Sequence, residues 1–417
     1  MKLKIRKKTL VIVILGLYLL FKHALEANST SIVNLIVSYS DEALTIMATG
    51  YVLYAMMSYK KVPKFAKSAL ASWGVLLLIG VVSTQFNMVQ PLKSDVIDMI
   101  TCSKFFAFYV ATGIYWNNHF QQDILLEFNG IVRFIVTVLS LLVICNVLIY
   151  PLFPSSEFRL FINSQQLFFG HPSNLADSAL FCFIILLINE DKIDKTNTLY
   201  MILASLSIVS TMRDKQISAM VFGWISYLYF YKFKFNSKFC LVAIGLVATI
   251  YIGYDSLSLY YGGNLDATAR GAMTSTGFQI AKEKFPLGYG FASFGSGASI
   301  TPYSKLYYQY KLSTIYGLTP LEPNFANDAF WPIVFGQFGW SGFIVFAFFF
   351  WSLLNQCFKI EENRLMFCGT LVLIAYLIIV TVGTTSIFND IFMLCAAILS
   401  YAFVYRYHCD NENQNVR

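Results

Sequence analysis

The residues best suited to chemistry are cations at the ends of apolar segments. Arg213 and Lys215 lie in a short polar turn, Ser210-Thr211-Met212-Arg213-Asp214-Lys215, between two apolar stretches. Arginine binds phosphate oxygens through paired hydrogen bonds and does not deprotonate in proteins. A charge at the mouth of a membrane helix is energetically expensive and therefore marks a candidate functional site. The turn predicts a site for an anion such as a lipid-linked phosphate, and an interfacial Arg–Asp pair is the alternative interpretation.

Arg270 is a second cation of this kind, because it stands just before a helix-like stretch that reaches Lys284. Asp266 or Thr268 can cap that helix. An arginine near a helix N-terminus opposes the helix dipole, and a bound anion would relieve this misfit. Asp328 opens a later apolar segment, where a carboxylate can act as a general base for a sugar hydroxyl. A solvated Arg270 and a plain helix cap at Asp328 explain the same residues without a function.

Four further residues flank these positions. His171 and Asn174 open another apolar segment, where a polar cap before Pro172 is the structural alternative. Lys282 follows Arg270 and could equally belong to a solvated helix face. Tyr289 lies in the turn-like run Pro286-Leu287-Gly288-Tyr289-Gly290 and could stack on a sugar ring or join a belt of tyrosines at lipid headgroups.

The composition identifies the protein as a membrane protein. Of its 417 residues, 57% are hydrophobic and 13% are charged, and the mean hydropathy is +0.60. Soluble domains carry about 25% charged residues. The net charge of +7 does not indicate nucleic-acid binding, because the basic residues lie mostly in short loops between apolar runs. The eight cysteines form no CxxC pair and the four histidines do not cluster, so we expect no metal and no cofactor.

Runs of ~20 mostly apolar residues predict about twelve transmembrane helices, and their continuous character excludes a β-barrel. The first run resembles a signal peptide, but many spans follow it and we expect it to be retained. The predicted fold is an all-α polytopic membrane protein with spans near residues 9–23, 43–59, 67–86, 99–118, 129–150, 172–189, 197–211, 217–231, 239–255, 329–354, 365–383 and 386–405.

The distribution of Lys and Arg predicts the orientation. With a cytoplasmic N-terminus, most basic loop residues fall on the cytoplasmic side, as does the C-terminus. The same count places a polar, tyrosine-rich loop outside the membrane. The chain then divides into nine helices over residues 1–255, a large extracytoplasmic loop over 256–328, and three helices with a cytoplasmic tail over 329–417.

The chain resembles the bacterial superfamily of O-antigen polymerases and O-antigen ligases, which includes the Wzy-type polymerases. Four pieces between about residues 165 and 345 carry the resemblance. They are similar, in order, to a Pro-Asn-small element (Gly170 to Ala176), a Thr-x-Ser-Arg element (Ser210 to Arg213), an Arg…Pro-Leu-Gly-x-Gly element (Arg270 and Phe285 to Gly290) and a His/Asp-Asn…Glu-x-Gly-x-x-Gly element (Asp328 and Gly336 to Gly342).

Four positions depart from the family pattern. Met212 replaces a serine, Ala329 replaces an asparagine, Gln337 replaces an acid, and Asp328 stands where ligases commonly have histidine. The missing histidine favours a polymerase over a ligase and leaves the identity of the base open.

The resemblance implies a metal-independent, inverting glycosyltransferase of the multi-span type in the bacterial cytoplasmic membrane. Its substrates would be oligosaccharide repeat units linked to undecaprenyl pyrophosphate, joined on the outer face into O-antigen, capsule or exopolysaccharide. Because the leaving diphosphate gains negative charge, fixed cations are the main catalytic requirement. The implied catalytic residues are Arg213, Arg270 and Asp328, and the implied substrate-binding residues are His171, Asn174, Lys215, Lys282 and Tyr289.

Two alternatives remain. A ligase would transfer finished polymer to an acceptor, and a flippase would move lipid-linked units across the membrane. A flippase should have duplicated halves around a charged cavity, whereas the polar residues here gather on one predicted face and no internal repeat is evident. Besides the lipid bilayer, the resemblance implies a chain-length regulator protein as a candidate partner, and we expect no nucleic-acid partner.

Overall fold

The computed structural model describes residues 7–58, 62–121, 124–155, 157–159, 162–190, 197–235, 268–360 and 363–416, with scattered positions between 237 and 258. The described chain is mainly helical, and its only paired strands are β1 (Phe158–Arg159) and β2 (Ile162–Asn163). Among these residues, seven helices are long and apolar enough to cross a membrane. The protein is therefore a helical, multi-pass membrane protein.

Six of the seven are α1 (Lys7–Asn28), α4 (Lys64–Asn87), α5 (Leu92–Asn118), α6 (Ile124–Leu148), α15 (Arg364–Thr381) and α16 (Ile391–Val416). The seventh is continuous through α13 (Phe330–Ile333), a π-helical turn (Val334–Phe338) and α14 (Gly339–Phe358). Shorter helices are α2 (Ser31–Ser38), α3 (Ser40–Met57), α7 (Pro172–Ile188), α8 (Asn197–Ser210) and α9 (Asp214–Tyr227), the last of which continues as a π-helical turn to Lys232.

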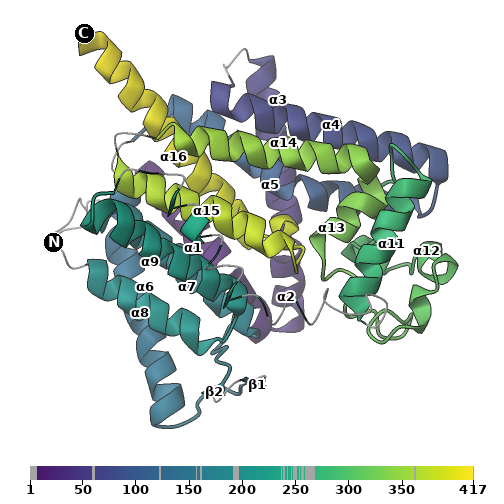
Figure 1. Cartoon of the computed structure of the whole chain (residues 1–417), viewed down its shortest axis with the longest axis horizontal. Helices are drawn as coiled ribbons and strands as arrows, with labels where there is room; N and C mark the ends of the chain where they lie inside the picture. Colours follow the sequence, from purple (N-terminus) through teal and green to yellow (C-terminus); the bar gives the residue numbers. More distant parts are fainter. Residues whose placement is uncertain are drawn as a thin grey trace.

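Two helices form the centres of the bundle (Figure 1). α5 packs against α3, α4 and α16, while α7 packs against α6, α8, α9 and α15. Within α7, every residue except Ser173 and Asn174 is buried. A helix that is apolar on all sides belongs in an interior, and the sequence of α7 has this character.

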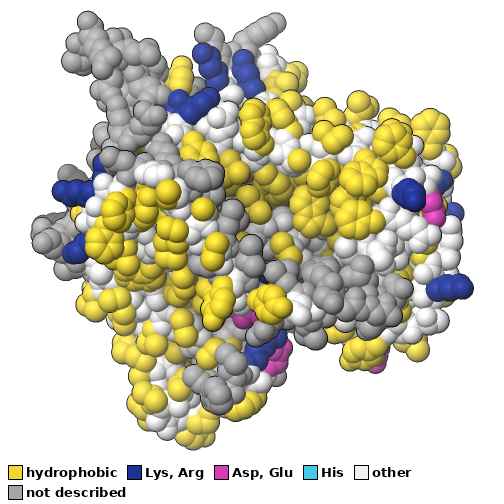
Figure 2. Space-filling view, viewed as in Figure 1, with side chains coloured by type: hydrophobic (Ala, Val, Ile, Leu, Met, Phe, Trp, Pro, Cys, Tyr) yellow, Lys and Arg dark blue, Asp and Glu magenta, His cyan; other side chains and the backbone are white. Residues whose placement is uncertain are grey.

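The outside of the bundle suits a lipid environment. Large apolar side chains are exposed on α3, α4 and α6, including Met57, Leu78 and Phe134. The face in Figure 2 is covered largely by hydrophobic side chains, and Lys and Arg side chains lie mainly near its margins. Exposed apolar surface of this extent marks a membrane contact rather than a solvated surface.

Residues 268–328 form a compact cap with a core of its own. It contains α11 (Ala269–Glu283) and α12 (Lys305–Gln309), which lie together with α13 in Figure 1. Thr268 caps α11, since its hydroxyl accepts the Gly271 amide at 3.1 Å. The small core is built from Ala272, Met273, Ile280, Phe294, Leu306, Tyr307, Leu312, Leu318 and Ala326.

Two glycine-rich segments hold this cap on the bundle. The Tyr289 amide donates to the Gly336 carbonyl at 2.8 Å, and the Gly290 amide donates to the Gln337 carbonyl at 2.9 Å. A Cβ at Gly288 would lie 2.5 Å from the Gln337 backbone, so the close approach requires glycine. The buried Asp98 carboxylate of α5 accepts the Ala292 amide at 2.6 Å. The two segments that carry part of the family resemblance thus pair in space.

Every predicted span except 239–255 falls on a helix, interrupted in 386–405 by the turn before α16. Much of 239–255, and residues 259–267 of the predicted loop, lie outside the described residues. The seven helices noted above meet the length and composition of a span. The count of twelve spans stays a prediction.

Candidate anion-binding site

Arg213 lies at a sharp reversal between two helices. α8 ends at Ser210 and α9 begins at Asp214, and Met212 makes the reversal in the left-handed region with φ of +51°. The extended segment after β2 fixes this turn, because the Ser164 hydroxyl donates to the Thr211 carbonyl at 2.6 Å. Arg213 is the residue that precedes the first turn of α9.

The Arg213 guanidinium is mostly buried but incompletely paired. Its Nη2 lies 3.5 Å from Glu157 Oε1, while its Nε is buried without a hydrogen-bond partner among the described residues. Arg159 Nε donates to the other oxygen of Glu157 at 2.7 Å, so two guanidinium groups share one carboxylate. Burial acts to raise the pKa of Glu157, but the Arg159 hydrogen bond and the Arg213 charge lower it. The turn keeps an excess of positive charge and a buried donor.

Arg270 and Asp328 form an ion pair, with 3.0 Å between Nη2 and Oδ2. Arg270 projects from the first turn of α11, and Asp328 lies just before α13, so the pair joins the two ends of the cap. Both side chains are partly exposed, at 19% and 33%. The residue expected to act as a base is therefore held by a residue expected to bind the leaving group.

Lys215 connects the two arginine positions. The charges of Arg270, Asp328 and Arg213 all act on its ammonium group, together with that of Asp177. These residues come from different elements, and each lies within electrostatic range of Lys215. We call Arg213, Lys215, Arg270, Asp328 and His171 the cationic cluster.

His171 belongs to this cluster because the charges of Arg213 and Asp328 act on its ring. Its Nδ1 accepts the Ser173 amide at 3.2 Å, which caps α7. Burial, followed by the positive charge of Arg213, lowers the pKa of His171. A neutral imidazole whose Nδ1 accepts a hydrogen bond carries its proton on Nε2. His171 thus has an N–H donor available at neutral pH.

The other three predicted binding residues have different surroundings. Lys282 is exposed near the far end of α11, about 18 Å along the axis from Arg270 at a rise of ~1.5 Å per residue. Tyr289 lies where the cap joins the bundle, with Lys284 Nζ 4.6 Å from its ring centre. Asn174 follows His171 in α7, but its amide donates to the Phe169 carbonyl at 3.2 Å. Their roles in binding remain predictions.

Sequence reasoning missed a second charged region inside the bundle, which we call the ion-pair network. Lys22 of α1 reaches three carboxylates, Glu26 at 3.0 Å, Asp41 at 2.9 Å and Asp390 at 2.9 Å. Lys104, in the middle of α5, pairs with Asp41 and, at 2.8 Å, with Glu42. A lysine inside the predicted span 99–118 was the signal in the sequence, because such a charge requires a partner.

His23 completes the network. Its Nδ1 lies 3.0 Å from Glu26 and its Nε2 lies 3.1 Å from Asp390, an arrangement that the doubly protonated imidazolium satisfies. The facing atoms of His23, Glu26 and Asp390 are close enough together to ligate a metal ion. Lys22 already pairs with both of these carboxylates, however, so the ion pairs account for the arrangement.

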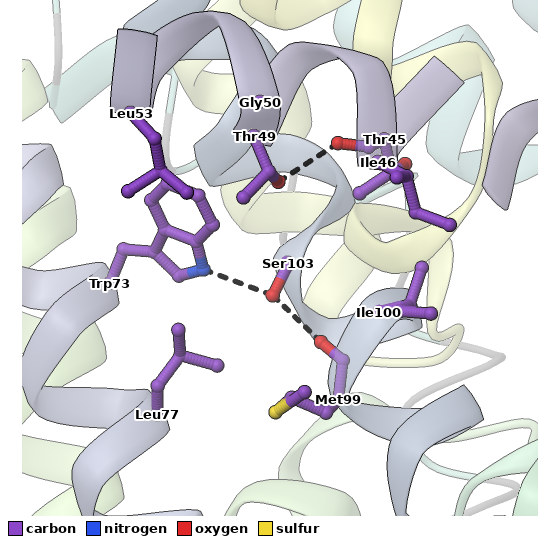
Figure 3. Close-up of a pocket in the computed structure, with 10 residues that line it drawn as sticks. All are labelled: Thr45, Ile46, Thr49, Gly50, Leu53, Trp73, Leu77, Met99, Ile100 and Ser103. Carbon is purple, nitrogen blue, oxygen red and sulfur yellow. Dashed lines mark hydrogen bonds between the residues drawn. The ribbon is translucent and has the colours of Figure 1, made fainter. Parts of the chain in front are cut away.

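An apolar groove lies elsewhere, between α3, α4 and α5 (Figure 3), and has a volume of about 300 Å³. No charged side chain lines it. Its polar atoms are satisfied internally, because Trp73 Nε1 donates to the Ser103 hydroxyl at 3.0 Å, and that hydroxyl donates to the Met99 carbonyl at 2.7 Å. The groove therefore offers apolar packing, whereas the cationic cluster offers charge chemistry.

No protein-family model matches the chain, and a search of curated proteins finds no match.

Proposed function

We propose that the protein is a polysaccharide polymerase that joins oligosaccharide repeat units carried on undecaprenyl pyrophosphate. The observation that supports this most directly is that the charges of Arg213 and Arg270 both act on Lys215, while Arg213 keeps a buried donor that has no partner among the described residues. Such a site fits an anion with several oxygens. The resemblance in sequence supplies the identity of that anion.

The proposed reaction is the attack of a hydroxyl on an anomeric carbon. The terminal hydroxyl of one repeat unit forms a new glycosidic bond to the growing chain, and undecaprenyl pyrophosphate leaves with the electrons of the broken C–O bond. Arg213 and Arg270 would stabilise the charge that develops on the diphosphate. The Nε2–H of His171 would donate a further hydrogen bond, and Asp328 would hold Arg270 in position.

We propose that this site faces the outside of the bacterial cytoplasmic membrane. The bundle would then cross the membrane about twelve times with both termini in the cytoplasm, as the Lys and Arg distribution indicates. The cap over residues 268–328 would form most of the large extracytoplasmic loop and bring Arg270 to the membrane boundary. A partner that regulates chain length remains part of the proposal.

The test is complementation of a deletion strain, with the polysaccharide separated on a gel. Arg213→Ala and Arg270→Ala should each reduce a ladder of polymer lengths to single repeat units, while Lys305→Ala, at an exposed position of α12, should leave the ladder intact. Each variant needs wild-type abundance in the membrane. Full-length polymer from both arginine variants would refute the proposal, and unattached finished polymer in the deletion strain would indicate a ligase instead.

A further inference from the structure

The proposed reaction needs a group that takes up the proton of the attacking hydroxyl, and the carboxylates of the cationic region are poor acceptors. Asp328 is paired with Arg270, and Glu157 is shared by Arg159 and Arg213. The Arg159 hydrogen bond and the Arg213 charge hold the pKa of Glu157 below its ordinary value, and the facing oxygen of Asp328 is occupied by Arg270.

His171 and Asp177 are also committed. The His171 Nδ1 already accepts the Ser173 amide, and the remaining nitrogen of the neutral ring is the one that carries the proton. Asp177 lies buried in α7, where its Oδ1 accepts hydrogen bonds from Gln216, at 2.6 Å, and from Tyr376. Using either residue as the acceptor would disturb a helix cap or a buried polar contact.

Lys215 differs from these groups in its surroundings. It lies in the first turn of α9, before the apolar stretch that begins at Ile217, and it is half-buried. Its Nζ donates one hydrogen bond, to the Gly383 carbonyl beyond the end of α15, at 2.9 Å. A hydrogen bond to a neutral carbonyl stabilises an ammonium less than a carboxylate would.

The charges around Lys215 come from each neighbouring element. Arg213 precedes it in the same turn, and the charges of Arg270 on α11, Asp177 on α7 and Asp328 just before α13 act on it. The two carboxylates are themselves engaged, by Arg270 and by the Gln216–Tyr376 pair. Burial, followed by the positive charge of Arg270, lowers the pKa of Lys215 to about 8. A substantial fraction of the amine is then neutral at slightly alkaline pH.

We propose that the neutral amine of Lys215 is the general base of the reaction. This inference rests on the proposed polymerase function. The acceptor hydroxyl transfers its proton to Lys215 Nζ, which becomes an ammonium, while the hydroxyl oxygen forms the bond to the anomeric carbon. The C–O bond to the diphosphate breaks, and the diphosphate leaves with the electron pair toward Arg213 and Arg270. The ammonium then returns its proton to water.

The decisive variant is Lys215→Arg, because it keeps the positive charge and removes the base. An arginine cannot deprotonate in a protein. We expect the polymerisation rate to fall by about 10²- to 10⁴-fold, the range over which general bases contribute. The substrate is lipid-linked oligosaccharide extracted from the deletion strain, and the enzyme is the full chain in membrane vesicles. A Lys215→Arg rate within about tenfold of wild type would refute the base assignment.

Geranyl pyrophosphate, a short isoprenoid diphosphate, separates the base from the anion site. It should inhibit the wild type and Lys215→Arg with similar potency if both keep the diphosphate-binding arginines. A large loss of inhibition in Lys215→Arg would assign Lys215 to diphosphate binding and overturn the inference. The function itself is tested separately, since only active Arg213→Ala and Arg270→Ala variants would refute it.

Two further measurements keep the test valid if the arginine side chain disturbs packing at Gly383. Added primary amines should restore activity to Lys215→Ala, and the restored rate should rise with amine basicity. In the wild type, the rate at saturating substrate should rise as the pH passes through about 8 and then level off. Absence of rescue together with a flat profile over this range would refute the proposal.

Discussion

The cationic cluster and the ion-pair network are both built from charges inside a largely apolar bundle, but their charges are paired to different extents. In the network, the ammonium of Lys22 meets three carboxylates and both ring nitrogens of His23 face one. In the cluster, Arg213 has a buried Nε without a partner among the described residues, and Lys215 donates to a backbone carbonyl. Each charged side chain of the network faces an opposite charge, although Glu42 Oε2 lacks a hydrogen-bond partner among the described residues. Opposite charges paired in this way suit a structural role, whereas unmet donors on cations suit an anionic ligand.

The network also joins helices that are far apart in sequence. Its members come from α1, α3 and α5 and from the residue before α16, so it holds the start of the chain against its end. The ion pair between Arg270 and Asp328 in the cluster instead joins the two ends of the cap. A change in the network should therefore reduce stability, and a change in the cluster should reduce activity.

The largest effect on stability is expected for Lys22→Met. Removing this ammonium leaves three carboxylates close together in the bundle, and breaking a buried ion pair in this way costs about 3–5 kcal/mol. The measurement is the fraction of monodisperse protein that survives heating in detergent. Lys305→Met is the matched control, because its side chain is exposed. Heat stability equal to that of the wild type would show that the network is not what holds these helices together.

The largest effect on activity without a loss of stability is expected for Arg213→Lys. A lysine keeps the charge but cannot offer the paired donors of a guanidinium. Loss of a preorganised donor costs about 10²- to 10³-fold in rate. The polymerisation rate in membrane vesicles measures the effect, and heat survival in detergent should be unchanged. A variant that is active but unstable would place Arg213 with the network and remove the contrast between the two regions.

A smaller effect is expected for Glu157→Gln, which should strengthen the binding of an anionic ligand rather than weaken it. The substitution removes the carboxylate that competes with a bound anion for Arg213 and Arg159. Exposed ion pairs contribute up to about 1 kcal/mol, so geranyl pyrophosphate should inhibit about two- to fivefold more strongly. The gain should shrink at high salt, because exposed charges are screened. Weaker inhibition would mean that Glu157 helps to position Arg213 rather than competing with the ligand.

The sequence predicted most of the helices because long apolar runs leave few alternatives in a membrane. It also made Arg213, Arg270 and Asp328 candidates, since charges at the ends of such runs are conspicuous, and their roles stay predictions. It did not predict the ion pair between Arg270 and Asp328, because that contact depends on how the cap folds back onto α13. Nor did it give Lys22 and Lys104 a shared partner, since Asp41 lies between them in the chain and no local pattern connects the three.

Tyr289 is a further residue whose tertiary contact the sequence did not predict. The turn residues around it predicted an irregular segment, and an aromatic ring there suited a sugar. In the structure, its backbone amide pairs with Gly336. The glycines in these two segments allow the two backbones to approach each other. In a sequence, such a packing requirement can look like a ligand-binding motif. Gly288, Gly290 and Gly336 therefore explain how the cap packs on the bundle, and they do not by themselves indicate where a substrate binds.

The smallest effect concerns His171, whose ring caps α7 through Nδ1 and carries an N–H donor on Nε2. Its pKa is lowered in the folded protein, so the unfolded chain binds a proton first as the pH falls. Its contribution to stability is therefore full above its ordinary value of about 6.5 and decreases as the pH falls toward the folded value. Heat survival of His171→Gln should depend less on pH than that of the wild type over this range. If the heat survival of His171→Gln depends on pH as strongly as that of the wild type, then protonation of His171 has no net free-energy cost in the folded protein. Desolvation and the charge of Arg213 would then not lower its pKa.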